Sequence, residues 1–171
     1  MRRQDFLRGL LGLAATPLIG CYNPIEPEDD DGESRRGVVE LFKTNTEWRG
    51  ILPEANYYIL FEGGTEVPYT SPLDAEYGAG TYICFACFLP LFVSEKKYDS
   101  ETGWPSFWDP IADALAFGDN FTSIEYHCRR CGGHQGHLFD DGPEPTGKRY
   151  CNNGLALRFI ADGEALPALR T

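Results

Sequence analysis

Residues 124–159 read IEYHCRRCGGHQGHLFDDGPEPTGKRYCNNGLALRF, and this stretch decides the fold. At both of its ends apolar side chains recur at every second position, which is the period of a half-buried strand. These apolar positions are Ile124, Tyr126, Cys128, Leu155, Leu157 and Phe159. Glycines and prolines between the two runs mark turns. Similar short runs begin at Tyr82, so the sequence predicts a mainly β domain of two small antiparallel sheets.

Helices are expected mainly before the strands. Residues 38–61 carry the clearest helical pattern, in which Thr46 is expected to cap one helix and Pro53 to begin another. A further short helix is predicted over residues 109–116, beginning at Pro110. The first two helices would lie at the periphery of the sheets, on the N-terminal side of the domain.

The N-terminus has the character of an export signal. Residues 1–20 combine a basic start with an apolar stretch that is shorter than the roughly 20 residues needed to span a bilayer. Residues 18–21, LIGC, resemble the lipobox of bacterial lipoproteins, with Cys21 as the lipidated residue. The opening MRRQDFLR resembles a twin-arginine signal, although two residues rather than one separate the arginines from Phe6. A cytoplasmic tail with a chance cysteine is the alternative.

These features predict an exported lipoprotein of the bacterial envelope. Residues 21–37 are acidic and rich in proline and glycine, which favours a flexible tether. A catalytic domain is expected over residues 38–165, with a tail over residues 166–171. The net charge of −11 disfavours binding to nucleic acid and to anionic lipid headgroups. Membrane contact would therefore run through the lipid anchor alone, and a monomer is expected.

Two Cys-x-x-Cys pairs suggest a metal site. They are Cys84 with Cys87 and Cys128 with Cys131. Zinc prefers tetrahedral thiolate coordination, and each pair places two sulfurs on one side of the metal. The sequence predicts one structural Zn²⁺ per chain. Disulfides in an oxidising compartment, or a redox-active pair, are the alternatives.

Cys151 is the cysteine left for chemistry once the other five are assigned. In a strand, Arg149, Cys151 and Asn153 would share one face. A guanidinium beside the sulfur favours the thiolate, which is the form that attacks. Leu155, Leu157 and Phe159 continue the same every-second-residue pattern. The strand face that carries Cys151 is therefore expected to continue into the core. A buried structural cysteine is the alternative interpretation.

Other candidate site residues flank this strand. His134 and His137 lie in a glycine-rich segment and are expected to donate protons or hydrogen bonds near neutral pH. Additional zinc ligation by these histidines is the alternative. Asp141 is expected to orient a histidine or Arg149. His127 has no companion and is interpreted as a surface or structural residue.

Aromatic residues in the segment GWPSFW, residues 103–108, supply candidates for substrate binding. An indole suits an apolar ligand group such as a thioether methyl, through contact area and sulfur–aromatic attraction. Trp104 is expected to face the pocket, and Phe107 is the second substrate-binding candidate. Phe107 and Trp108 also suit the core.

Together these stretches resemble the methionine-R-sulfoxide reductase family of the MsrB type. The resemblance rests on the segments KYDSETGWPSFW (residues 97–108), CRRCGGHQGHLFDDGP (residues 128–143) and TGKRYCNNGLALRF (residues 146–159). It implies a fold of two antiparallel sheets and reduction of methionine-R-sulfoxide. The predicted export and tether suggest oxidised envelope proteins as the substrates. The four paired cysteines match the zinc-bearing subgroup of that family.

The resemblance also implies roles for individual residues. Cys151 matches the cysteine that attacks the sulfoxide sulfur and becomes a sulfenic acid. His134 and His137 match the paired active-site histidines, and His137 is the expected proton donor to the sulfoxide oxygen. Trp104 matches the residue that packs on the substrate methyl. The remaining matches form the polar support of the site: Asp141, Arg149 and Asn153.

The chain departs from the family pattern at two positions. Thr102 stands where many members carry a resolving cysteine, so a thioredoxin-like protein or a small thiol is expected to reduce the sulfenic acid directly. Asn152 replaces the usual Ile or Val, with a modest effect on packing expected. A non-catalytic zinc-binding module on the same fold and a thiol–disulfide oxidoreductase are the alternative functions.

Overall fold

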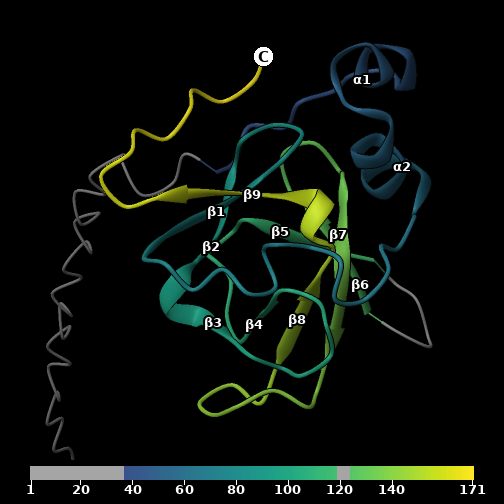
Figure 1. Cartoon of the computed structure of the whole chain (residues 1–171). Coiled ribbons are helices and arrows are strands. Elements are labelled where there is room, and N and C mark those ends of the chain that lie inside the picture. The colour runs from purple at the N-terminus through teal and green to yellow at the C-terminus, as the bar shows by residue number, and fades with distance from the viewer. Residues whose placement is uncertain (1–36, 119–123) are drawn as a thin grey trace, which may run out of the picture. The chain divides into compact units, whose positions relative to one another are not determined.

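The computed structural model of this chain describes residues 37–118 and 124–171 (Figure 1). These residues belong to one compact unit, Arg35–Thr171. The predicted signal peptide, Cys21 and residues 22–36 of the predicted tether lie outside the described residues. Within the described ranges, no helix has the length and apolar character required to cross a membrane.

Two short helices precede the sheets. Helix α1 (Asn45–Ile51) begins with a capping box in which the Thr44 hydroxyl accepts a hydrogen bond from the Glu47 N–H, and the Glu47 carboxylate accepts one from the Thr44 N–H. The prediction of Thr46 as the cap is therefore wrong by two residues, because only Thr44 has a glutamate three positions later. Helix α2 (Glu54–Glu62) follows Pro53 as predicted, and its Phe61 stacks on Trp48 of α1.

The helix predicted over residues 109–116 is wrong. Asp113 has a φ of 59°, which lies in the left-handed region and cannot continue a right-handed helix. The chain turns there and enters β5 (Leu115–Phe117), which pairs with β6 (Ile124–Cys128). Burial of Ala114 and Leu115 against the core favours this edge strand over a helix.

Two antiparallel sheets make up the rest of the domain, which confirms the predicted mainly β fold. The smaller sheet has the order β2 (Pro90–Val93), β1 (Gly80–Cys84), β9 (Leu157–Ala161). The larger sheet has the order β3 (Lys97–Tyr98), β4 (Ser106–Phe107), β8 (Arg149–Asn152), β7 (His134–Phe139), β6, β5. The 3-10 helices are η1 (Ser94–Lys96) and η2 (Gly154–Ala156).

Aromatic rings from both sheets form the core. Phe107 of β4 stacks on Phe92 of β2 with ring centroids 4.3 Å apart, and Tyr82 of β1 meets Phe107 edge-on at 4.9 Å. All three rings are fully buried. Burial of aromatic rings of this size contributes several kcal/mol, so the contact holds the sheets together. The core placement expected for Phe107 is confirmed.

The sequence predicted that apolar side chains would continue to alternate from β8 into the core, but the structure interrupts this pattern. Helix η2 lies between β8 and β9, and it redirects the chain from the larger sheet to the smaller one (Figure 1). Leu155 in η2 is consequently about one-third exposed instead of continuing the buried face. Ala156 and Leu157 return to the core. The strand that carries Cys151 therefore ends at Asn152.

Candidate active site and metal centre

The two Cys-x-x-Cys pairs converge in the structure. Cys84 ends β1 and Cys128 ends β6, and each is followed by a turn that carries its partner cysteine. The Sγ atoms of Cys84 and Cys131 are 3.7 Å apart, and those of Cys87 and Cys128 are 3.5 Å apart. A tetrahedral metal with bonds of about 2.3 Å places its sulfur ligands roughly 3.8 Å from one another. The donor set therefore fits a tetrathiolate metal site.

The chemistry of the cluster also fits a cation. All four cysteines are free thiols, which does not match the disulfide alternative. Burial raises the pKa of the Cys84 thiol, while hydrogen bonds from Cys128 lower the pKa of Cys87. Ionisation of all four buried thiols requires a positive charge between them. The Gln135 Nε2 lies 3.7 Å from the Cys84 sulfur and supports this arrangement as a weak donor.

Strand register brings the candidate nucleophile to the middle of the larger sheet. Cys151 on β8 lies opposite Ser106 on β4 and opposite His137 on β7. Gly136 permits this approach, because a Cβ at that position would lie 1.8 Å from the Cys151 carbonyl oxygen. The lack of a side chain at residue 136 therefore sets the spacing between β7 and β8 next to the sulfur.

A cavity of about 180 Å³ opens beside this sulfur. Its lining includes four of the predicted site residues, which come from three separate segments: Cys151, Asn153, His137 and Trp104. The other lining residues are Thr65, Gly136, Phe139 and Asn152. The cavity combines a thiol, an imidazole and an indole wall, which are the groups needed to bind an apolar sulfur compound and to exchange a proton with it.

The indole of Trp104 is held in place by Glu66. The Trp104 Nε1 donates to the Glu66 main-chain oxygen at 3.1 Å, and the Glu66 N–H donates to the Asn153 Oδ1 at 3.0 Å. Asn153 also donates to the main-chain oxygen of Gln135 at 3.2 Å. Asn153 therefore links the indole to β7 as well as lining the cavity.

Phe107 does not line this cavity. Its side chain is fully buried between the sheets against Phe92, so its assignment as a substrate-binding residue is corrected by its position. Successive residues of β4 point to opposite faces of the sheet. The hydroxyl of Ser106 consequently points toward Cys151 while the ring of Phe107 enters the core.

Burial controls the ionisation of Cys151. Desolvation raises the pKa of this thiol, and the Arg149 guanidinium together with hydrogen bonds to Ser106 and Thr102 opposes the rise. The expected direction of the Arg149 effect is therefore present, but it does not produce a net lowering. The net shift of the Cys151 pKa is upward, which favours the thiol over the thiolate.

Arg149 itself is fixed from two sides. Its Nε and Nη2 donate to the two carboxylate oxygens of Asp141 at 2.7 and 2.8 Å, and its guanidinium lies over the Phe139 ring at 4.2 Å. The pKa of Asp141 is lowered mainly by the hydrogen bonds from Arg149. The structure thus brings together the Asp141 and Arg149 pair that was expected from the sequence.

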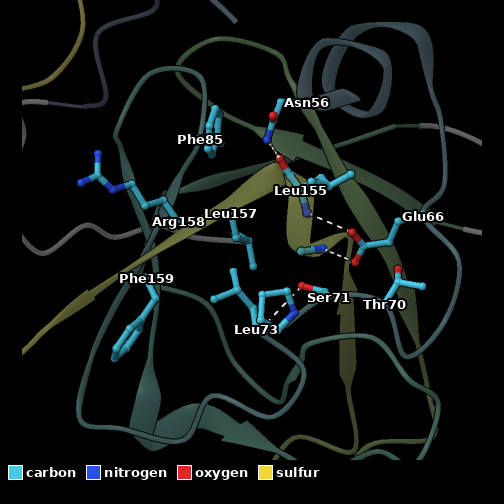
Figure 2. A pocket seen from close by; sticks show the side chains of 12 residues that line it. Asn56, Glu66, Thr70, Ser71, Leu73, Phe85, Leu155, Leu157, Arg158 and Phe159 are labelled. Carbon is cyan, nitrogen blue, oxygen red and sulfur yellow. Dashed lines mark hydrogen bonds between the residues drawn. The ribbon is translucent and has the colours of Figure 1, made fainter. Parts of the chain in front are cut away.

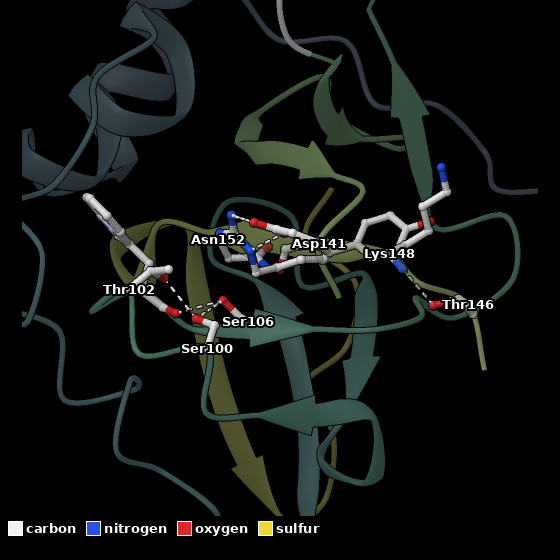
Figure 3. A network of polar contacts seen from close by, with 10 residues as sticks. Ser100, Thr102, Ser106, Asp141, Thr146, Lys148 and Asn152 are labelled. Carbon is white, nitrogen blue, oxygen red and sulfur yellow. Dashed lines mark hydrogen bonds and ion pairs between the residues drawn. The ribbon is translucent and has the colours of Figure 1, made fainter. Parts of the chain in front are cut away.

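A chain of hydroxyl groups adjoins the sulfur. The Ser100 hydroxyl lies 2.8 Å from both the Thr102 and Ser106 hydroxyls (Figure 3). The sequence analysis did not identify Ser100 or Ser106 as site residues. Ser106 belongs to the GWPSFW segment, so that motif carried a signal for it, whereas Ser100 became visible only through the fold.

His134 lies behind the cavity instead of lining it. Its ring is 5.4 Å from that of His137, and its Nδ1 is 2.5 Å from a carboxylate oxygen of Glu125. Burial lowers the pKa of His134, and the neighbouring Glu125 carboxylate opposes this shift. Glu125 was not predicted as a neighbour of the site. Of the two predicted histidines, only His137 lines the cavity beside the Cys151 sulfur.

Asn152 is almost completely buried. Its Nδ2 donates to the Tyr150 main-chain oxygen at 3.1 Å, and its own N–H donates to the Pro105 oxygen at 2.9 Å. Local backbone acceptors therefore satisfy the Nδ2 of this side chain, whereas its buried Oδ1 has no hydrogen-bond partner among the described residues.

A larger cavity of about 380 Å³ lies on the side of η2 (Figure 2). Glu66 borders it, and its carboxylate accepts hydrogen bonds from the N–H groups of Gly154 and Leu155. Its lining holds neither cysteine nor histidine. This cavity therefore lacks the groups that mark the smaller one as the candidate active site.

The fold and the site define a thiol-dependent enzyme with a four-cysteine cluster. Residues 52–161 match the SelR domain family. The chain is 45% identical over 129 residues to the peptide methionine sulfoxide reductase MsrB of Hahella chejuensis, covering 72% of this chain and 93% of that protein. The MsrB of Leptospira interrogans is 42% identical over 125 residues, which is 70% of this chain and 95% of that protein. This chain belongs to the MsrB family of peptide methionine sulfoxide reductases.

The effect of the Arg149 guanidinium on the Cys151 pKa leads to a prediction about the reactivity of Cys151. Arg149→Met removes a positive charge that stabilises the thiolate, so the Cys151 pKa should rise and its alkylation should require higher pH. Mass spectrometry of the Cys151 peptide after iodoacetamide treatment at a series of pH values measures this profile. Lys148→Met is the matched control, because Lys148 pairs with Asp140 at the surface. An unchanged profile for Arg149→Met would show that the guanidinium does not act on the sulfur.

Proposed function

We propose that this protein reduces methionine-R-sulfoxide, in oxidised proteins, to methionine by means of Cys151. The observation that carries the proposal is the cavity in which Cys151, His137 and Trp104 meet. The names of the relatives support the reaction class. The cavity volume of about 180 Å³ suits a side chain with a thioether-sized end.

The proposed reaction begins with Trp104 packed on the methyl group of the sulfoxide. The Cys151 thiol gives up its proton as its Sγ attacks the sulfoxide sulfur, and His137 delivers a proton to the sulfoxide oxygen. The sulfur–oxygen bond of the substrate and the transient bond between the two sulfurs then break as the hydroxyl group moves to the Cys151 Sγ, so methionine leaves and Cys151 carries a sulfenic acid. The methionine sulfur is reduced by two electrons and the cysteine sulfur is oxidised by two, and the proton lost by the thiol replaces the one that His137 gave.

A thiol from outside the chain is proposed to complete the cycle. Thr102 occupies the position beside Cys151 where many family members carry a second cysteine, and the other four described cysteines form the cluster. A thioredoxin-like or small-thiol reductant would attack the sulfenic acid and release water. A second thiol would then restore Cys151 and leave as part of the external disulfide.

We propose that the tetrathiolate cluster holds one Zn²⁺ with a structural role. The spacing of the four sulfurs fits its tetrahedral geometry, and the ion would supply the charge that ionises the thiols. Cysteines that bind zinc are not available for thiol–disulfide exchange. Zinc binding by both pairs therefore disfavours the thiol–disulfide oxidoreductase alternative. A non-catalytic module would need neither Cys151 nor His137 at a cavity.

Export as a lipoprotein also remains a proposal, supported by residues 1–21. The expected location is the bacterial envelope, with the domain tethered through Cys21 and otherwise clear of the membrane. A monomer remains the expected state.

The activity is tested with a peptide that contains the R and S epimers of methionine sulfoxide and with a dithiol reductant. We expect loss of the R epimer only, and turnover below detection for Cys151→Ser. A single turnover without reductant should leave Cys151 as a sulfenic acid that dimedone traps. Turnover by Cys151→Ser, or an intramolecular disulfide to Cys151, would contradict the mechanism. No turnover by folded protein would favour the binding module.

Metal content tests the tetrathiolate proposal. Elemental analysis should find about one zinc per chain in the native protein and in Cys151→Ser, but a loss of zinc in Cys128→Ser. Metal removal should lower the free energy of unfolding by several kcal/mol, because binding energy is coupled to folding. Thermal denaturation with and without a chelator measures the change. Equal stability in both conditions would argue against a structural metal.

The lipid anchor is tested by labelling cells with a radioactive fatty acid. The native chain should incorporate the label and sediment with membranes, whereas Cys21→Ser should do neither. An unlabelled native chain would contradict the lipidation of Cys21.

A further inference from the structure

One polar cluster remains outside both sites. Glu125 and His127 lie two residues apart on β6, and His134 faces them from β7. We call these three residues the hairpin cluster. Each contributes one ligand-type atom, and these atoms lie within 4.8 Å of one another. The sequence analysis treated His127 as a residue without a companion, and the strand pairing supplies two.

The distances within the hairpin cluster have the scale of a coordination sphere. One carboxylate oxygen of Glu125 lies 3.1 Å from the His127 Nε2 and 2.5 Å from the His134 Nδ1. Bonds of about 2.0–2.2 Å from a metal to imidazole nitrogen and carboxylate oxygen place neighbouring donors roughly 3 Å apart. Small shifts of these side chains would therefore admit an ion between them.

His134 supplies a second, independent observation. It is only 4% exposed, and while its Nδ1 pairs with the Glu125 carboxylate at 2.5 Å, its Nε2 makes no hydrogen bond within the described residues. Buried polar atoms without such a partner are rare and mark missing ligands or waters.

The hairpin cluster is also reachable and separate from the cysteines. The side chains of Glu125 and His127 are 24% and 29% exposed, so an ion can enter from solvent. Cys128 follows His127 directly, but alternation along β6 turns its sulfur to the opposite, fully buried face. The two sets of ligands therefore cannot share one ion.

We propose that Glu125, His127 and His134 form a second metal site for a divalent transition ion. Two imidazoles and one carboxylate suit ions such as Ni²⁺, Cu²⁺ and Zn²⁺ better than Ca²⁺ or Mg²⁺, which prefer oxygen. The site lies behind the proposed active site, since His134 contacts both Glu125 and the ring of His137. This inference goes beyond the proposed reaction and does not require it.

Titration calorimetry of the full chain with Ni²⁺ tests the site after zinc loading of the cysteine cluster has been verified by elemental analysis. We expect one additional equivalent of Ni²⁺ to bind, without a thiolate-to-nickel charge-transfer band in the near-ultraviolet spectrum. His127→Ala and Glu125→Gln should each weaken this binding by about tenfold or more, because each loses a direct ligand. The exposed Glu95→Gln is the carboxylate control and should bind as the native chain does.

The outcomes separate this site from the proposed function. Binding that is unchanged in His127→Ala, binding accompanied by a thiolate charge-transfer band, or no additional equivalent would each overturn the assignment. Circular dichroism of both variants verifies that a loss of binding does not reflect unfolding. Because the readout is metal binding, failure of sulfoxide reduction leaves the result interpretable, and His127→Ala should reduce the sulfoxide at the native rate.

Discussion

The convergence of four sulfurs at the ends of β1 and β6 is the constraint from which the rest of the domain follows. These strands belong to different sheets, so the cluster ties the smaller sheet to the larger one at one point. The turn at Cys131 leads directly into β7, whose register then places His137 opposite Cys151. A displaced cluster would shift β7 and separate the imidazole from the sulfur.

At Cys151 the burial required for a defined pocket opposes the charge required for nucleophilic attack. Desolvation raises the thiol pKa, and Arg149 and two hydroxyl groups act against that rise without overcoming it. Such a balance suits a sulfur that should react with a bound substrate and not with dissolved oxidants, because the thiolate fraction governs reactivity. The bidentate contact with Asp141 keeps the guanidinium where this opposition is effective.

Patterns that act over short distances allowed much of the fold and part of the site to be predicted. The two-residue period indicated the strands, and Cys-x-x-Cys spacing indicated the cluster, because both reflect geometry within a few residues. The strand at Leu115 was missed because the left-handed backbone of Asp113 has no sequence signature comparable to glycine. Phe107 was also assigned to substrate because composition alone does not say which face of β4 it occupies.

The contacts that were not predicted join residues far apart in the sequence. The approach of Glu66 to Asn153 and Gly154 depends on the completed fold, as does the pairing that brings His127 to His134. Local periodicity carries no information about such pairs. Burial of Glu66, Asn153 and His134 explains why these contacts are specific once the sheets have formed.

Glu66 has a consequence for the energetics of ligand capture. Its carboxylate, main-chain N–H and main-chain oxygen contact η2, Asn153 and Trp104 respectively, so one residue braces the indole against the end of β8. The ring is therefore immobilised during folding and not when a ligand arrives. Freezing a mobile side chain at an interface costs about 0.5–1.5 kcal/mol, and this wall avoids that cost. A ligand that offers little more than a methyl group to the indole can consequently retain most of the free energy of that contact.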